Sequence, residues 1–155
     1  MPKHSAGILM YRRVGEDIEV FLVHPGGPFW RKKDRAAWSI PKGEFSSDED
    51  PLEAAKREFK EETGKDVSGD FFSLNTLKQP GGKIVHAWAT HGDCDASKIK
   101  SNTFTMEWPP KSGKKQEFPE IDKAAWFRTH VAREKIHKGQ VKLIDRLLEN
   151  LEERD

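Results

Sequence analysis

The apolar segments in the first third of the chain predict β-strands separated by turns. Residues 6–11 and 18–24 are apolar runs of strand length, and residues 15–17 between them are typical of a turn. Glycine and proline at positions 25–28 then break the pattern. We therefore expect strands at 6–11, 18–24 and 38–41, with a basic loop flanked by aromatic residues at 29–37.

The second half of the chain combines further strands with helical spacing at its end. Turn residues at 79–82 separate two strand-like segments, and Ile144, Leu147 and Leu151 lie at the spacing of one helix face. Thr129 is a candidate N-cap for a short helical turn before this helix. The elements expected here are strands at 71–77, 83–90 and 103–108, a loop at 108–115, a short apolar run at 124–127 and a C-terminal helix after Gly139.

A helix over residues 51–63 is predicted by local signals at both of its ends. Asp50 is a good N-cap, Pro51 suits the first helical position, and Glu53 stands where a capping box places an acid. Gly64 suits the left-handed residue that ends a helix. Strands on both sides of this helix predict an α/β (α+β) fold. We expect an α/β/α sandwich around a mixed β-sheet, as one domain over residues 1–155.

Composition narrows the class of protein. The chain has 155 residues, 34% charged and 35% hydrophobic, which is typical of a globular domain. The net charge of +1 argues against a protein that coats nucleic acid, so no stable nucleic-acid partner is expected. Cys94 is the single cysteine, which excludes an internal disulfide and a Cys-based zinc site.

The apolar runs are too short for a membrane span or a signal peptide. We therefore expect no membrane partner and a cytoplasmic location. The sequence carries no signature of an oligomeric state.

One face of the predicted central helix carries three acids. Glu58, Glu61 and Glu62 lie at i, i+3 and i+4, where like charges repel one another. A divalent cation removes the repulsion, and carboxylate oxygens are ligands that suit Mg²⁺. The same spacing also occurs on solvated helix faces, so the three acids alone leave both interpretations open. The neighbouring apolar face, which should pack inward, consists of Leu52, Ala55 and Phe59.

The wider segment around these acids resembles the Nudix box. The pattern is glycine, five residues, glutamate, seven residues, Arg-Glu-apolar-any-Glu-Glu, any residue and glycine. Lys65 departs from the family pattern, which usually has an aliphatic residue there, and Val67 is expected to take over its packing role. The matching residues are Gly43, Glu49, Arg57, Glu58, Phe59, Glu61, Glu62 and Gly64.

The resemblance implies roles for these residues by position. Nudix hydrolases cut pyrophosphate linkages with Mg²⁺ or Mn²⁺, and Glu49 and Arg57 would form a structural pair that fixes the loop to the helix. Glu58 or a carboxylate from a later loop would activate the attacking water. The implied metal ligands are Glu58, Glu61, Glu62 and the Gly43 carbonyl.

A later acid is expected to complete the site. Glu107, Glu117 and Glu120 are the candidates, and we favour Glu120 because it precedes a segment ending in Trp126 and Phe127, as a glutamate does in some relatives. The alternative interpretation is an ordinary exposed loop acid. The catalytic residues expected from the sequence are Glu58, Glu61, Arg57 and Glu120.

The residues before the box indicate a nucleotide polyphosphate as substrate. Residues 38–44 are similar to the approach to the box in diadenosine polyphosphate hydrolases. Lys42 can contact a phosphate as a point charge, Trp30 and Trp108 can stack on bases, and Lys33 belongs to a basic loop. Each could equally be a loop anchor or a solvated surface residue. The expected substrate-binding residues are Lys42, Trp30, Lys33 and Trp108.

The expected function is Mg²⁺- or Mn²⁺-dependent hydrolysis of a pyrophosphate bond in a nucleoside or dinucleoside polyphosphate, such as diadenosine tetraphosphate. One alternative is an NTP pyrophosphohydrolase that cleans a nucleotide pool. Another is a non-catalytic Nudix-fold module that binds nucleotides. Such modules commonly lose box carboxylates, and this chain keeps them all.

Overall fold

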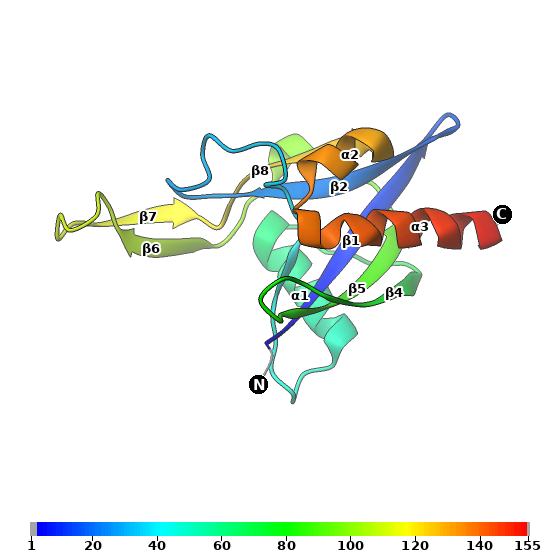
Figure 1. The fold of residues 1–155 in the computed structure, drawn as a ribbon, viewed down its shortest axis with the longest axis horizontal. Helices are drawn as coiled ribbons and strands as arrows, with labels where there is room; N and C mark the ends of the chain where they lie inside the picture. The colour runs from blue at the N-terminus through cyan, green and yellow to red at the C-terminus, as the bar shows by residue number, and fades with distance from the viewer. Residues whose placement is uncertain (1–2, 155) are drawn as a thin grey trace.

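The computed structural model describes residues 3–154 as a mixed β-sheet with helices on both faces and a separate two-stranded hairpin (Figure 1). The strands are β1 (His4–Val14), β2 (Asp17–Pro25), β3 (Lys42–Glu44), β4 (Phe71–Lys78), β5 (Ile84–His91), β6 (Thr103–Glu107), β7 (Lys115–Pro119) and β8 (Ile121–Arg128). The α-helices are α1 (Pro51–Thr63), α2 (Thr129–Lys135) and α3 (Val141–Arg154), and short 3₁₀ turns form η1 (Ala96–Lys98) and η2 (Lys138–Gln140).

Strand β1 is the centre of the sheet. The strand order is β4-β5-β1-β2-β8, and β3 pairs with the first half of β1 while β2 pairs with its second half. Strands β1 and β5 run parallel, whereas β2, β3 and β8 join antiparallel, as does β4 to β5. The predicted mixed sheet is therefore confirmed.

Alternate residues of β1 enter two different hydrophobic cores. Ala6, Ile8 and Met10 face the core formed with α1. Leu9 and Tyr11 face the other core, which α2 and α3 cover. A strand buried on both faces explains why its sequence is a continuous apolar run instead of an alternating one. The predicted α/β/α sandwich is confirmed.

Helix α1 begins and ends where the local signals predict. Asp50 Oδ2 accepts a hydrogen bond of 3.1 Å from the Glu53 N–H, which caps the first turn. Gly64 has a φ of 78°, a conformation that glycine adopts without strain, and its N–H is bonded to the Lys60 carbonyl at 2.7 Å. Both ends of the helix are thus fixed by residues within it or beside it.

The buried stripe of α1 differs from the prediction at one position. Ala54 is fully buried together with Ala55 and Phe59, whereas Leu52 is only half-buried. The stripe is centred on Ala55, so Leu52 lies at its margin. Val67 packs against the same core. It was expected to do so in place of the aliphatic residue that the family usually has at the position of Lys65.

The strand predicted at 38–41 is wrong, because the regular strand here is β3, which starts at Lys42. Trp38 and Ser39 make only isolated bridges. The Ile40 N–H is taken by the Gln140 side chain at 3.1 Å, and Pro41 has no N–H to donate. A continuous ladder therefore cannot form over this segment.

The segment after Trp108 contains more strand than predicted. The expected loop at 108–115 includes Lys115, the first residue of β7. The apolar run at 124–127 lies within β8. The strand signal is weak because β7 is almost entirely exposed and β8 keeps several exposed charged residues. Thr129 is also not an N-cap, since Arg128 holds that position and Thr129 is the first helical residue.

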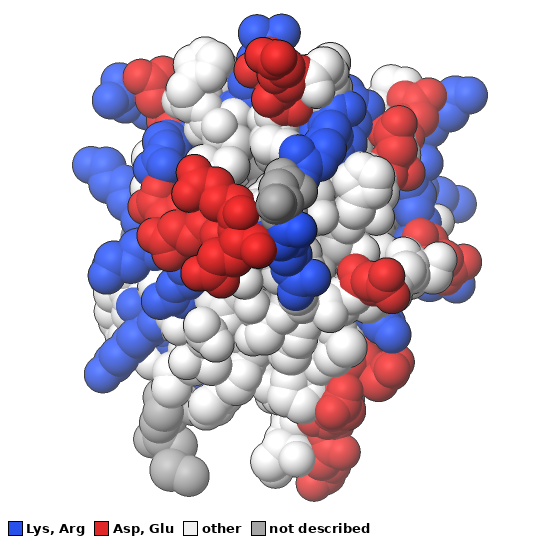
Figure 2. All heavy atoms as spheres, turned by 90° about the vertical axis from the view of Figure 1, so that its right-hand side faces the viewer, with Lys and Arg blue, Asp and Glu red and all other residues white. Residues whose placement is uncertain are grey.

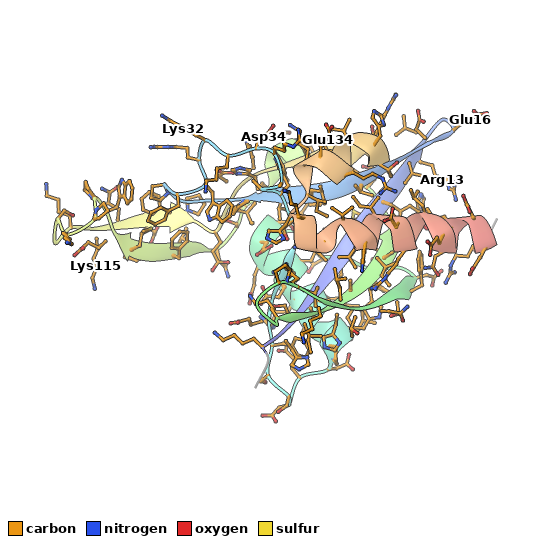
Figure 3. All side chains as sticks on the ribbon, in the orientation of Figure 1. Arg13, Glu16, Lys32, Asp34, Lys115 and Glu134 are labelled. Carbon is orange, nitrogen blue, oxygen red and sulfur yellow. The ribbon has the colours of Figure 1, made fainter. Side chains whose placement is uncertain are left out.

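The β6–β7 hairpin and the loop of residues 26–37 project from the sheet on the same side (Figure 1). Phe29 of the loop and Trp108 of the hairpin connect them, with T-shaped rings 5.4 Å apart. Lys32 and Lys115 are exposed on these two arms (Figure 3). The arms therefore bring aromatic and basic residues from distant parts of the chain to one side of the molecule.

The opposite end of the molecule carries charges of both signs (Figure 2). This end contains the turn between β1 and β2, with Arg13 and Glu16, and the end of α3 (Figure 3). Among the helices of residues 3–154, none is long and apolar enough to cross a membrane. A single domain over residues 1–155 remains a prediction, and residues 1, 2 and 155 lie outside the described part.

Candidate active site

Glu58 is the buried member of the acidic face, and it lies against β3. The residue is 8% exposed, which is uncommon for a glutamate. A Cβ placed on Gly43 would collide with the Glu58 carboxylate. A side chain at position 43 would therefore require the Glu58 carboxylate to move.

Arg57 connects the loop before α1 with two of the acids. Its Nε and Nη2 donate to the two Glu49 oxygens at 2.7 and 3.0 Å, a bidentate arrangement. Its Nη1 donates to Glu58 at 2.8 Å and to both Glu61 oxygens at 3.2 Å. The hydrogen bond from Arg57 lowers the pKa of Glu49, and the bond to Glu49 is the largest of those that raise the pKa of Arg57. The expected pairing of Glu49 with Arg57 is confirmed.

Glu62 is the acid that contacts the start of β3. Its carboxylate accepts a hydrogen bond of 3.2 Å from the Lys42 N–H. Burial raises the pKa of Glu62 to about 8, and the charges of Glu58 and Glu120 add to this effect. Burial and then the charge of Glu61 raise the pKa of Glu58. Carboxylates whose ionised forms are disfavoured in this way gain most from a bound cation.

Glu120 is the late acid whose charge reaches the acidic face. It lies between β7 and β8, where its carbonyl accepts from the Gly26 N–H and its N–H donates to the Asn102 carbonyl, both at 2.8 Å. Burial is the largest cause of the raised pKa values of Glu58 and Glu62, and the negative charge of Glu120 is a smaller cause that raises them further. The backbone of this exposed residue is therefore fixed near the other acids.

The two other late acids lie on the β6–β7 hairpin. Glu107 accepts a hydrogen bond of 2.8 Å from the Lys111 N–H in the hairpin turn. Glu117 is exposed on β7, in register with Thr105. Neither is among the charges that perturb the buried acids of α1.

The donor set of the acidic face suits a hard divalent cation. Three carboxylates and the Gly43 carbonyl supply oxygen ligands, and burial raises the pKa values of two of these acids, Glu58 and Glu62. Over residues 3–154, no three acidic, histidine or cysteine side chains converge on one point. Glu61 is instead turned to Arg57, and because its side chain is 36% exposed, it has room to turn toward a cation.

A cavity of about 330 Å³ opens beside Lys42, and two of the four expected substrate-binding residues, Lys42 and Trp30, line it. Trp30 lines the same cavity, and the Lys33 ammonium lies 5.0 Å from the centre of the Trp30 ring. Burial and the nearby charge of Lys83 lower the pKa of Lys42. Trp108 is not brought to this cavity, because it lies on the hairpin.

Residues that the sequence patterns did not select form another part of the cavity wall. Gln79 and Lys83 flank the turn between β4 and β5, and His137 and Gln140 belong to the segment of η2. Polar residues in turns give no sequence signal of burial. Only the fold shows that these two turns, far apart in sequence, lie side by side.

The loop that carries Trp30 is fixed to the sheet and to α2. His24 is fully buried, with Nδ1 2.8 Å from Asp122 Oδ1 and Nε2 2.5 Å from the Lys33 carbonyl. Asp34 pairs with Lys135 at the end of α2. These contacts hold the loop next to the strand that follows Glu120.

Comparison with known proteins gives the family and the fold. A model of the NUDIX domain matches residues 1–147, and a comparison with curated protein sequences finds no match. The Ap4A hydrolase of C. elegans in a binary complex has a TM-score of 0.65 and 22% identity, covering 95% of this chain and 97% of that one. The NUDIX domain of Shewanella oneidensis NrtR with ADP ribose has a TM-score of 0.66 and 15% identity, covering 97% and 89%. A MutT/Nudix family protein of Listeria innocua has a TM-score of 0.62 and 12% identity, covering 99% and 97%.

The structural likenesses at these identities establish a shared fold, and the family model establishes the family. Nudix hydrolases generally use a divalent metal ion, which agrees with the oxygen donors of the acidic face. The chain therefore belongs to the NUDIX domain family and is a Nudix pyrophosphohydrolase.

Proposed function

We propose that the protein hydrolyses a pyrophosphate bond in a nucleoside or dinucleoside polyphosphate such as diadenosine tetraphosphate, with Mg²⁺ or Mn²⁺ as cofactor. The position of Lys42 carries this proposal. Its backbone N–H is bonded to Glu62 of the acidic face, while its side chain lines the cavity that holds Trp30. A ligand with a ring in the cavity would have its phosphates over Lys42 and beside the acids.

We assign metal binding to Glu58, Glu61, Glu62 and the Gly43 carbonyl. When bound, Mg²⁺ would neutralise phosphate charge and lower the pKa of a water molecule. Arg57 holds Glu58 and Glu61 through its Nη1 and thereby sets the separation of these two carboxylates. We count Arg57 as a positioning residue because its contacts are to protein carboxylates.

Glu58 or Glu120 would take the proton of the attacking water on a carboxylate oxygen. The water oxygen forms its bond to phosphorus while the bond from phosphorus to the bridging oxygen breaks, and the bridging oxygen leaves with the departing phosphate. Glu58 is buried and bonded to Arg57, whereas Glu120 is exposed on a fixed backbone. This difference favours Glu120 as the base.

The two arms give a dinucleoside substrate a place for each base. A cavity of about 330 Å³ is at the lower end of the range of about 300–1,000 Å³ for small-ligand sites, so it suits one nucleoside. Trp30 would stack on that base, and Lys33 lies over the Trp30 ring. The second base would lie outside the cavity, near Trp108 of the hairpin.

Hydrolysis of a substrate panel tests the proposal. The panel contains diadenosine tetraphosphate and nucleoside triphosphates, with Mg²⁺ or Mn²⁺ at alkaline pH, and mass spectrometry identifies the products. We expect turnover of diadenosine tetraphosphate. Cleavage of triphosphates alone, to a monophosphate and pyrophosphate, would favour the pool-cleaning enzyme. Inactivity across the panel would favour a nucleotide-binding module.

A further inference from the structure

The cavity beside Lys42 contains an imidazole whose proton position is determined by the backbone. His137 caps η2, and its Nδ1 accepts a hydrogen bond of 3.0 Å from the Gly139 N–H. A backbone N–H can only donate, so Nδ1 is the unprotonated nitrogen. The Gln79 Nε2 lies 3.4 Å from the same nitrogen, and this fixes which end of the Gln79 amide faces the ring. The proton of the neutral ring is therefore on Nε2.

The surroundings of the His137 ring favour its neutral form. Burial lowers its pKa, and the positive charge of Lys42 adds to this effect. A proton on Nδ1 would also face the Gly139 N–H and disrupt the cap. Over residues 3–154, the Nε2–H has no hydrogen-bond partner. His137 thus brings an unused donor to the wall of the cavity.

The ring is also held firmly in place. The His137 backbone N–H donates to the Trp38 carbonyl at 2.7 Å. A Cβ placed on Gly139 would lie 3.1 Å from the Gln79 Nε2 and 3.2 Å from the His137 Nδ1, so these three residues are closely packed. A donor on such a rigid support loses little conformational entropy when it binds a ligand.

Gln140 in the same wall provides a contrast. Its Oε1 accepts from the Ile40 N–H at 3.1 Å, and its Nε2 donates to Ser39 Oγ at 3.0 Å. Both ends of this amide are used inside the protein, and the residue is 1% exposed. Gln140 therefore supports the segment before β3, whereas His137 keeps a hydrogen-bonding group for a ligand.

We propose that the His137 Nε2–H recognises the substrate by donating to a ring nitrogen of a purine base seated in this cavity. The inference rests on the proposed function, because the phosphates must lie over Lys42. Trp30, which is 38% exposed, offers a flat face for the same base. A ring with C–H at that position would leave the donor unpaired and bind more weakly. His137 is then a specificity-determining residue, and Gln79 is a positioning residue for its ring.

Equilibrium binding of AMP analogues tests this inference. The probes are AMP and its 1-deaza, 3-deaza and 7-deaza analogues, each of which lacks one ring acceptor, measured by calorimetry without divalent cations. We expect one analogue to bind about five- to tenfold more weakly than AMP and the others to bind like AMP. His137→Phe should bind all four probes equally and weakly. The exposed His130 provides a matched control, since His130→Phe should keep the difference.

Four results would overturn the inference. They are the absence of AMP binding, equal binding of all four probes to the wild-type protein, an undiminished preference in His137→Phe, and, with 2′-deoxy-AMP as a fifth probe, a loss of binding seen for that analogue alone, which would place the donor on the sugar. If His137→Phe does not fold, ¹⁵N NMR of the wild-type ring replaces it. AMP should then perturb the signal of a protonated Nε2, and a proton found on Nδ1 would contradict the assignment.

The binding measurement tests the role of His137 separately from the proposed hydrolysis, because AMP contains no pyrophosphate bond. Hydrolysis of diadenosine tetraphosphate without a preference among the AMP analogues would contradict the role of His137 alone. A preference among the analogues in a protein that hydrolyses no member of the panel would contradict the proposed function alone.

Discussion

The acidic face of α1 and the cavity beside Lys42 meet at β3, but the chain builds them in different ways. The three acids of α1 lie within five consecutive residues, 58–62, and Arg57 of the same helix holds two of them. The cavity takes its wall from segments between Pro25 and Gln140. The first region depends on one helix, and the second depends on the positions of several turns.

This difference has consequences for how substitutions act. Helix geometry sets the spacing of the acids, so a change of one acid removes a charge and leaves its neighbours in place. In the cavity, a change alters contacts with the part of the substrate that does not react. We therefore expect the first region to control turnover and the second to control affinity.

The largest effect is expected for the acids of α1. Glu61→Gln and Glu62→Gln should each lower kcat by about 100-fold or more, because each removes one negative oxygen donor of the cation site. Steady-state kinetics with diadenosine tetraphosphate at saturating Mg²⁺ measure this. Glu53→Gln is the matched control, since Glu53 lies on the same helix with a side chain that is 67% exposed. Near-normal turnover in both variants would exclude these residues from the site.

Glu120 tests whether the acidic face extends beyond α1. Glu120→Gln should lower kcat by about 100-fold with little change in KM, as expected when a general base is lost. Glu117→Gln on the neighbouring strand should have no such effect. An unchanged rate in Glu120→Gln would make this residue a bystander and return the role of the base to Glu58.

Gly43 tests the contact between the two regions. Gly43→Ala should lower kcat about tenfold or more, because the new Cβ would displace the Glu58 carboxylate. The effect should be much smaller when Glu58→Ala is already present, since the colliding group is gone. Equal losses in both backgrounds would show that Gly43 acts through something other than Glu58.

Trp30 tests the cavity. Trp30→Ala should raise KM about tenfold and leave kcat within about twofold, because loss of a stacked base weakens binding without touching the reacting phosphates. Trp108→Ala should raise KM for diadenosine tetraphosphate but not for ATP, which has one base. A fall in kcat in Trp30→Ala, without a change in KM, would contradict the division between the regions.

The smallest expected effect is on thermal stability, and it is the pH dependence of the stabilisation by Mg²⁺. The pKa of Glu62 is about 8 in the folded chain and about 4.5 in the unfolded chain, so this group stabilises the metal-free fold below pH 4.5 and loses that contribution as pH rises through 8. A bound cation competes with this proton. We expect 10 mM Mg²⁺ to raise Tm by about 5 °C at pH 8.5 and hardly at all at pH 6. An equal shift at both values would exclude Glu62 as a ligand.

The same contrast explains how much of the molecule could be predicted from its sequence. Helix α1 was predicted to the residue, because Asp50, Pro51 and Gly64 act within a few positions of the ends that they define. The contact of Arg57 with Glu49 also followed from the box. Both features depend on local spacing, which a sequence shows directly.

Long-range features were beyond the sequence patterns. The strand expected at 38–41 failed because Gln140, a hundred positions later, takes the Ile40 N–H. The proximity of His137 to Gln79 depends on how two turns meet in the folded chain. A β-strand such as β7, exposed along most of its length, also lacks the apolar alternation that would reveal it.

The most direct test of the central claim, that the acids of α1 form a divalent-cation site, is a titration with Mn²⁺ followed by electron paramagnetic resonance at pH 8. We predict saturable binding to the wild-type protein that excess Mg²⁺ reverses. Binding should be weaker by about 100-fold in the double variant Glu61→Gln, Glu62→Gln. Equal Mn²⁺ affinity in the wild-type protein and the double variant would contradict the account.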